Sequence, residues 1–140
     1  MRATFPIFLV LIVVSASTIA AAAPPKEKDE APEVIVGYVQ QLTMRVNNYD
    51  DGRVITQHTA VIEVDVVVRT TSDNGRVVKA GDTITVRWSR VDWPPRTIGY
   101  KYEVEEKAIV RAYLARQCGG EGFYVIHNAE GLVKIDRDRN

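Results

Sequence analysis

Alternation of apolar and polar residues constrains this chain more than any other feature of its sequence. From Glu33 onward, large apolar side chains recur at about every second position, most clearly within 34–46, 54–70 and 83–88. A period of two is typical of half-buried β-strands, whereas an amphipathic helix repeats about every 3.6 residues. Turn-forming Gly, Asn and Asp residues separate the alternating stretches. We therefore expect a domain made of β-strands.

The number of such stretches defines the fold class. Five to seven short strands in about 105 residues fit one small core. We expect an all-β fold, a small five- to seven-stranded OB-like barrel, with a β-sandwich as the alternative. Residues 104–116 are the one segment with competing helical propensity, and their β-branched and aromatic residues favour a strand.

The alternation also predicts which side chains share the core. On two of the strands, several successive residues of one parity are large and apolar. The residues of that parity are Ile62, Val64, Val66, Ile84, Val86 and Trp88. We expect Val66→Asp to bury an unpaired carboxylate and to destabilise the fold.

Residues 1–23 are organised like an export signal. Arg2 provides a positive charge, residues 7–14 are all apolar, and small residues dominate from 15 to 23. Signal peptidase requires small side chains at the cleavage site, so we expect cleavage between Ala20 and Ala23. The expected location is secreted or periplasmic through a Sec-type signal peptide, with no membrane span after cleavage. The alternative is an uncleaved N-terminal membrane anchor, for which the apolar segment is barely long enough.

The remainder of the chain divides by composition. Residues 24–32 are rich in proline and charge and contain no large apolar residue. Such a segment is typical of a solvated linker, because it has little to bury. We expect four regions: a signal peptide over 1–23, a disordered linker over 24–32, a β-barrel domain over 33–135, and a polar tail over 136–140.

Overall charge and cysteine content exclude several classes of protein. The chain has 18 Lys and Arg residues against 18 Asp and Glu residues, a formal net charge of zero. This balance provides no general attraction to nucleic acid or acidic lipid, so we expect neither as a partner. The single Cys excludes an intramolecular disulfide and a zinc site built from cysteines.

Residues with catalytic or metal-binding chemistry are few. His58, His127 and Cys118 are the only histidines and the only thiol. The sequence shows no third group that would orient a Cys–His nucleophile pair. The spacing of these three residues does not match that of zinc ligands. The oxygen-bearing side chains of 47–51 are explained by turn formation without a calcium ion. We therefore expect a non-enzymatic protein without a cofactor or metal.

The stretch from Arg87 to Tyr102 mixes basic and aromatic residues, a combination that binds ligands by stacking and charge. Trp88 has the parity of the core. Trp93 precedes two prolines that we expect to end the strand and begin a loop to about Gly99, where an indole either caps the barrel or is displayed. The candidate ligand- or partner-binding residues are Arg90, Trp93, Arg96 and Tyr100.

Three segments, taken together, resemble a known class of domain. They are 34–39 (VIVGYV), 78–86 (VKAGDTITV) and 108–114 (AIVRAYL). Their order resembles that of secreted OB-fold-like domains of the netrin-module and tissue-inhibitor-of-metalloproteinases type, especially the disulfide-poor bacterial relatives. The resemblance implies a barrel and export. This chain lacks the animal families' cysteine framework and the N-terminal cysteine with which the inhibitors chelate zinc, so the resemblance implies no protease inhibition and no functional residue.

The sequence therefore favours an exported, non-catalytic binding or interaction module. The expected partner is an unidentified protein or glycan in the envelope or the extracellular space. The alternative is a small-ligand or carbohydrate binder that uses the loop around Trp93.

Overall fold

The computed structural model describes residues 26–71, 77–117 and 122–136, so the expected signal peptide lies outside the described residues. The described part of the chain forms strands and one short 3-10 helix, with no α-helix. The elements are η1 (Lys28–Glu30), β1 (Glu33–Asn48), β2 (Val54–Arg69), β3 (Thr83–Trp93), β4 (Arg96–Ile98), β5 (Ile109–Arg116), β6 (Phe123–Val125) and β7 (Leu132–Lys134). The all-β prediction is confirmed, and β5 confirms a strand in the segment with competing helical propensity.

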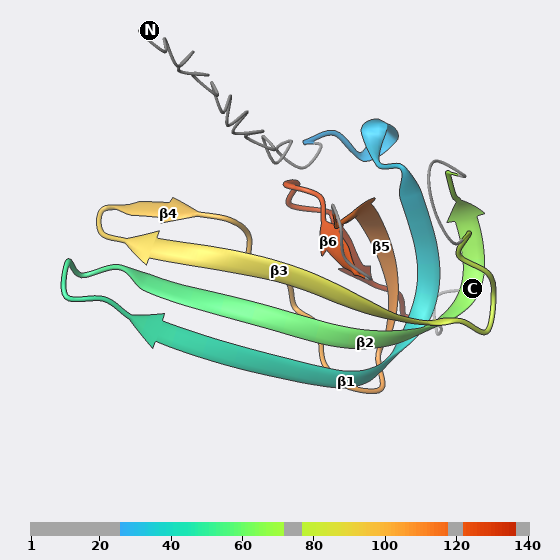
Figure 1. The fold of residues 1–140 in the computed structure, drawn as a ribbon, viewed down its shortest axis with the longest axis horizontal. Helices are drawn as coiled ribbons and strands as arrows, with labels where there is room; N and C mark the ends of the chain where they lie inside the picture. Colours follow the sequence, from blue (N-terminus) through green and yellow to red (C-terminus); the bar gives the residue numbers. More distant parts are fainter. Residues whose placement is uncertain (1–25, 72–76, 118–121, 137–140) are drawn as a thin grey trace, which may run out of the picture.

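Five of the strands close into a barrel (Figure 1). The order is β1-β2-β3-β6-β5, and β5 pairs with β1 to complete the ring. The barrel is mixed, because β3 and β6 are parallel and the other neighbours in the ring are antiparallel. Two extra strands lie outside the ring, β4 on β3 and β7 on β5. The barrel prediction is confirmed over the sandwich.

The barrel interior is filled mainly by aliphatic side chains, which come from all five barrel strands, from β7 and from the segment before β3. The buried cluster consists of Ile35, Val39, Ala60, Ile62, Val64, Val78, Ile84, Val86, Trp88, Val110, Ala112, Leu114, Val125 and Leu132. It includes five of the six core residues predicted from alternation. Burying a side chain of this size stabilises a fold by about 1.5–3 kcal/mol, so the cluster accounts for the barrel's cohesion.

The prediction for Val66 is wrong. Val66 is 53% exposed, whereas Val64 is 1% exposed. Val66 lies opposite Val36 and Val64 lies opposite Gly37, so Asp65 is an extra residue in β2, a β-bulge. The bulge reverses the alternation, and Val67 packs against the core in place of Val66. Gly37 permits the close approach of the strands there, since a Cβ atom on it would lie 2.5 Å from the Glu63 carbonyl oxygen.

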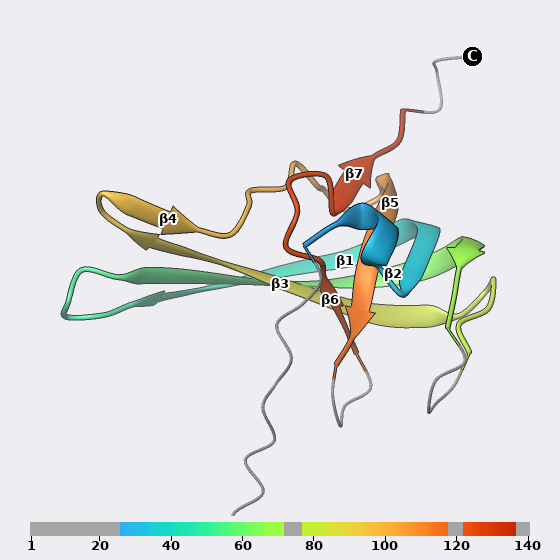
Figure 2. The ribbon, with the colours of Figure 1, turned by 90° about the horizontal axis from the view of Figure 1, so that it is seen from above.

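Three strands continue beyond the barrel as a thin, extended arm (Figures 1 and 2). β1 pairs with β5 only from Glu33 to Tyr38, yet it pairs with β2 as far as Asn48. On the other side of the arm, β3 runs to Trp93 and returns as β4 after Pro94 and Pro95, which are joined by a cis peptide bond. The segment after Trp93, predicted as a loop, is therefore in large part a hairpin. The two prolines fit at its turn, where no backbone N–H has to donate a hydrogen bond to a neighbouring strand.

Residues 26–32, within the predicted disordered linker, lie against the barrel. Arg69 donates hydrogen bonds to the carbonyl oxygens of Asp29 and Ala31, both at 3.0 Å. Ala31 is only 1% exposed, and Lys28 forms an ion pair with Glu130. The expectation that this segment has nothing to bury does not hold at Ala31, and these contacts direct the chain into β1.

Candidate functional site

The two faces of the arm carry different side chains, because successive residues of a strand point to opposite sides. Met44, His58 and Trp88 lie opposite one another across β1, β2 and β3. Trp88 belongs to the barrel core, so this row defines an inner face that continues the core outward. The neighbouring row, which includes Arg45 and Ser89, lies on the outer face.

A cluster of two aromatic rings around one guanidinium group lies at the end of the arm. We call Tyr49, Arg53 and Trp93 the tip cluster. The guanidinium carbon of Arg53 is 5.0 Å from the centre of the Tyr49 ring and 5.9 Å from the centre of the Trp93 ring. Both distances are within the range of cation–π attraction. The β1–β2 turn and the end of β3 are therefore joined by side chains as well as by the sheet.

The turn between β1 and β2 holds Arg53 in this position. The Asp51 carboxylate accepts hydrogen bonds from the Arg53 backbone N–H at 3.1 Å and from Nε at 2.6 Å. Gly52 has a positive φ of 86°, which glycine adopts without steric cost. The local sequence thus orients the guanidinium toward the rings without burying it.

Trp93 is displayed and does not cap the barrel. Trp93 is 50% exposed, and Tyr49 is 45% exposed. Arg96 lies directly opposite Trp93 in the β3–β4 pairing, so two of the four candidate binding residues meet at the tip.

The other two candidate residues, Arg90 and Tyr100, lie elsewhere. Arg90 forms a 2.9 Å ion pair with Asp92, and both have the parity of the inner face. Tyr100 packs near His127, with 5.0 Å between ring centres. The four residues predicted as one site thus do not form one cluster, because parity along β3 separates Arg90 from Trp93 and Tyr100 packs with other rings.

An aromatic cluster lies where the inner face meets the barrel. The imidazole of His58 stacks on Trp88, with ring centres 4.9 Å apart and an interplanar angle of 7°. Tyr102 meets Trp88 edge-on at 6.0 Å, and Tyr100 joins Tyr102 to His127. Burial lowers the pKa of His58, because the protonated ring would lose hydration. Both histidines therefore take part in ring packing, a contact between distant segments that the sequence alone does not reveal.

Tyr102 fastens the segment after β4 to the barrel. Its hydroxyl donates a 2.7 Å hydrogen bond to the carbonyl oxygen of Asn128. Burial raises the pKa of Tyr102 to about 12, so the phenol remains a neutral donor at physiological pH. Its role here is to position the adjacent segment.

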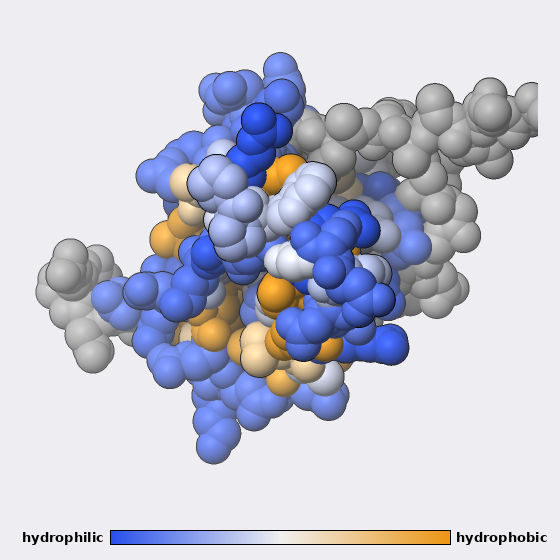
Figure 3. All heavy atoms as spheres, turned by 90° about the vertical axis from the view of Figure 1, so that its left-hand side faces the viewer, coloured by the Kyte–Doolittle hydropathy of each residue, from blue (hydrophilic) through white to orange (hydrophobic). Residues whose placement is uncertain are grey.

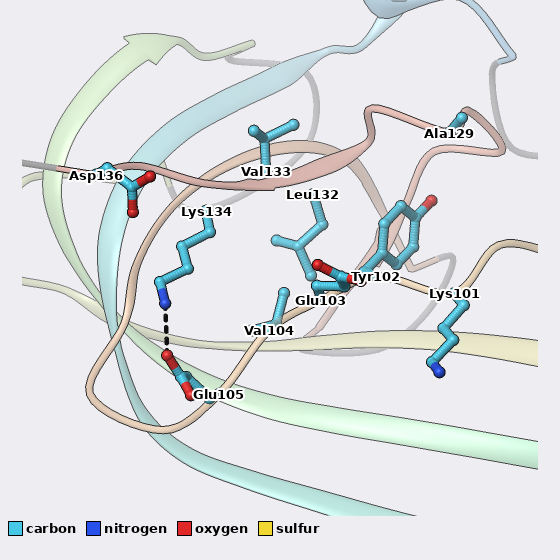
Figure 4. A pocket seen from close by; sticks show the side chains of 10 residues that line it. All are labelled: Lys101, Tyr102, Glu103, Val104, Glu105, Ala129, Leu132, Val133, Lys134 and Asp136. Carbon is cyan, nitrogen blue, oxygen red and sulfur yellow. Dashed lines mark hydrogen bonds and ion pairs between the residues drawn. The ribbon is translucent and has the colours of Figure 1, made fainter. Parts of the chain in front are cut away.

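A shallow pocket of about 620 Å³ lies between residues 101–105 and β7 (Figure 4). Val104 and Leu132 contribute apolar surface, and the charged lining residues carry both signs. Glu105 and Lys134 already form a 2.5 Å ion pair, which lowers the pKa of the carboxyl and raises that of the amine. This lining has no convergent set of like charges that would select an ionic ligand.

A buried carboxylate, that of Glu33, lies at the end of the barrel where β1 begins and β5 ends. Glu33 is 0% exposed, and its Oε1 accepts a 2.9 Å hydrogen bond from Arg116 Nε and a 3.3 Å bond from the Thr71 hydroxyl. The guanidinium of Arg116 also lies 5.8 Å from the centre of the Phe123 ring. This pair links the start of β1 to the end of β5, so its role is structural.

Within the described ranges, no group of three or more His, Cys, Asp or Glu residues is arranged to hold a metal ion. Cys118 lies outside the described residues. In the same part of the chain, no helix has the length and apolar character needed to cross a membrane.

Comparison with known proteins found no relative. No family model matches the chain, and neither a curated protein nor a solved structure is detectably similar to it. What is established is a five-stranded mixed β-barrel, and no family is identified for the chain.

Proposed function

We propose that the protein is an exported, non-catalytic binding module that recognises its partner with the tip of the arm. The observation that carries the proposal is the half-exposed Trp93, with the Arg53 guanidinium near its ring and Arg96 opposite it. Tryptophan and arginine are the residues that most often dominate binding energy at protein interfaces. An exposed indole also offers a large apolar area with few torsions to immobilise.

The rigidity of the tip supports the same proposal. Trp93 lies at a hairpin end, and Arg53 is fixed by Asp51 on the neighbouring turn. Side chains held in place before binding lose less conformational entropy when a partner arrives. Binding residues are commonly found at loop ends supported by a rigid sheet, as here.

The connectivity of the barrel gives a second line of support. A five-stranded barrel with β3 parallel to β6 is similar to the barrel of OB-type domains. Such domains bind oligonucleotides and oligosaccharides with the face of their second and third strands and with the loop between their first two strands. Two residues of the tip cluster, Tyr49 and Arg53, belong to the corresponding loop of this chain, the turn between β1 and β2.

The non-catalytic part of the proposal rests on the state of the histidines. His58 is stacked on Trp88, and His127 lies against Tyr100. Among the described residues, no carboxylate positions either ring in the way that one usually positions a general base.

Carbohydrate is the second candidate for the partner, and the exposed indole face favours it. The apolar face of a sugar ring packs on an aromatic ring, while its hydroxyls need donors and acceptors nearby. Arg96 and Asp51 provide such groups beside Trp93 and Arg53.

Trp93→Ala tests the proposal, with Tyr124→Ala as the matched control. Tyr124 is an exposed aromatic on β6, 40% accessible and away from the arm. We expect Trp93→Ala to weaken capture of partners from an envelope or extracellular extract by about 1–3 kcal/mol, as for one stacked group, with an unchanged melting temperature. Tyr124→Ala should leave capture unchanged. Equal capture by wild type and Trp93→Ala would refute the tip as the binding site, and a glycan array with the same variants separates protein from carbohydrate partners.

A further inference from the structure

Past the barrel, β1 has a neighbouring strand on one side only. It pairs with β2 throughout. On the other side, the last backbone hydrogen bonds join Val39 to Lys107 and Ala108. Beyond them, the Leu42 N–H donates a hydrogen bond to the Glu106 carboxylate. In the described part of the chain, nothing is bonded to the outer side of 43–48. Figure 1 shows β1 as the outermost strand of the arm. We call the outer side of residues 42–48 the free edge.

Two hydrogen bonds establish which backbone groups face outward. In an antiparallel ladder, alternate residues direct both N–H and C=O to the same side. The Leu42 N–H faces Glu106, away from β2, whereas the Tyr49 N–H bonds to Arg53 within the hairpin. The even-numbered residues Met44, Val46 and Asn48 therefore direct their N–H and C=O groups outward.

The free edge lacks the features that normally prevent pairing. Edge strands are commonly protected by Lys, Pro, a bulge or shortness. Residues 42–48 (LTMRVNN) contain neither Lys nor Pro, and their only charge is Arg45. By contrast, β4 at the other side of the arm has only three residues. The free edge is therefore the longer template for another strand.

The side chains on this edge are apolar on one face. Met44 is 61% exposed and Val46 is 48% exposed, and both belong to the inner face beside the aromatic cluster. Figure 3, which faces the end of the arm, shows apolar residues exposed among polar ones on this side of the molecule. A second strand here would gain backbone hydrogen bonds and would also cover these side chains.

We propose that the free edge pairs antiparallel with the same edge of a second copy of this chain, around a two-fold axis at Val46. In this register Val46 lies opposite the partner subunit's Val46, and Met44 lies opposite the partner subunit's Asn48. Arg45 then lies opposite the partner subunit's Asn47. The two arms form one continuous sheet, with the same surface used by both copies.

Two registers closer to the barrel, centred on Arg45 and on Met44, are less favourable. Centring the axis on Arg45 places two like charges directly opposite each other. Centring it on Met44 requires the Leu42 N–H, which already bonds to Glu106. The Val46 register keeps that hydrogen bond and separates the arginines.

Cysteine cross-linking tests the pairing and its register. In a Cys118→Ser background, Val46→Cys places two thiols on residues whose Cα atoms are about 5.5 Å apart, within reach of a disulfide. Thr43→Cys is the matched control, because its two copies lie roughly 20 Å apart at about 3.4 Å per residue. We expect a cross-linked dimer with Val46→Cys and none with Thr43→Cys. Cross-linking with Met44→Cys in place of Val46→Cys would overturn this register.

Sedimentation of the purified protein tests the association itself. We expect a concentration-dependent monomer–dimer equilibrium. Val46→Pro removes one outward N–H without removing a bond to β2, and we expect it to weaken dimerisation at least tenfold while unfolding stays cooperative. Val46→Thr retains the donor and should still dimerise. A wild-type monomer at all concentrations, or open-ended assembly as expected for β1 pairing with β4, would overturn the proposal.

Discussion

The bulge at Asp65 leads to a sharp prediction about two valines that are two residues apart. If the alternation of β2 continued without interruption, Val64 and Val66 would be buried equally. The structure instead places Val64 in the core at 1% exposure and Val66 in solvent at 53%. Replacing each with aspartate should therefore give very different stabilities.

The size of the difference follows from burial. Val64→Asp loses about 1.5–3 kcal/mol of apolar burial and also buries a carboxylate without a partner. Together these effects should lower the free energy of unfolding by at least about 3 kcal/mol. For a domain of this size, that corresponds to a fall of at least about 12 °C in melting temperature. Val66→Asp should change the free energy of unfolding by less than about 0.5 kcal/mol, as surface substitutions usually do.

Thermal unfolding followed by circular dichroism measures both variants under identical conditions. Val66→Asn serves as the control for repulsion between the new carboxylate and Asp65. An equally large fall in melting temperature for Val66→Asp and Val64→Asp would show that both valines are buried. It would refute the bulge at Asp65.

Further variants test the hairpin, the buried ion pair and the tyrosine. Gly99 has a φ of 97°, and a Cβ atom on it would lie 2.5 Å from the Ser89 carbonyl oxygen. Gly52 also has a positive φ, but open space surrounds it, so Gly52→Ala should lower the free energy of unfolding by only about 1–2 kcal/mol. Gly99→Ala should therefore destabilise the fold more than Gly52→Ala. Arg116→Met leaves Glu33 buried without its cation and should cost about 3–5 kcal/mol in urea unfolding, part of which Glu33→Gln in the same chain should restore. Because folding raises the pKa of Tyr102 to about 12, this phenol ionises near pH 10 only in the unfolded chain. Stability should therefore fall from pH 10 toward 12, and Tyr102→Phe should reduce this slope in melts recorded across that range.

The strands were predictable from the sequence because alternation is a local property. The stretch 54–70 was predicted as one strand, and β2 covers Val54–Arg69. A closed barrel was predictable only as a fold class. The pairing of β1 with β5, which closes it, joins segments whose sequences do not indicate that they are neighbours. The hairpin after Trp93 was missed because two adjacent prolines usually indicate the end of pairing.

The tip cluster, which we propose as the binding site, was predictable only in part. Trp93 and Arg96 were identified because they are close in the sequence and of types that bind ligands. Tyr49 and Arg53 were missed, since only the register of β1, β2 and β3 brings their turn beside Trp93. The signal that points to them is their position on either side of the Asp51-Gly52 turn, where cross-strand neighbours are close.

The bulge at Gln40 explains why a single parity fails along β1. Val39 lies opposite Ile62 and Gln41 lies opposite Val61, so Gln40 is an extra residue. Before it, the odd-numbered Ile35 and Val39 belong to the barrel core, and after it the even-numbered Leu42 packs against that core. The same change of phase turns the amides of the even residues toward the free edge. One inserted residue therefore keeps the apolar β1 side chains Leu42, Met44 and Val46 on the inner face beyond the barrel, and it also determines which backbone groups a second strand would meet.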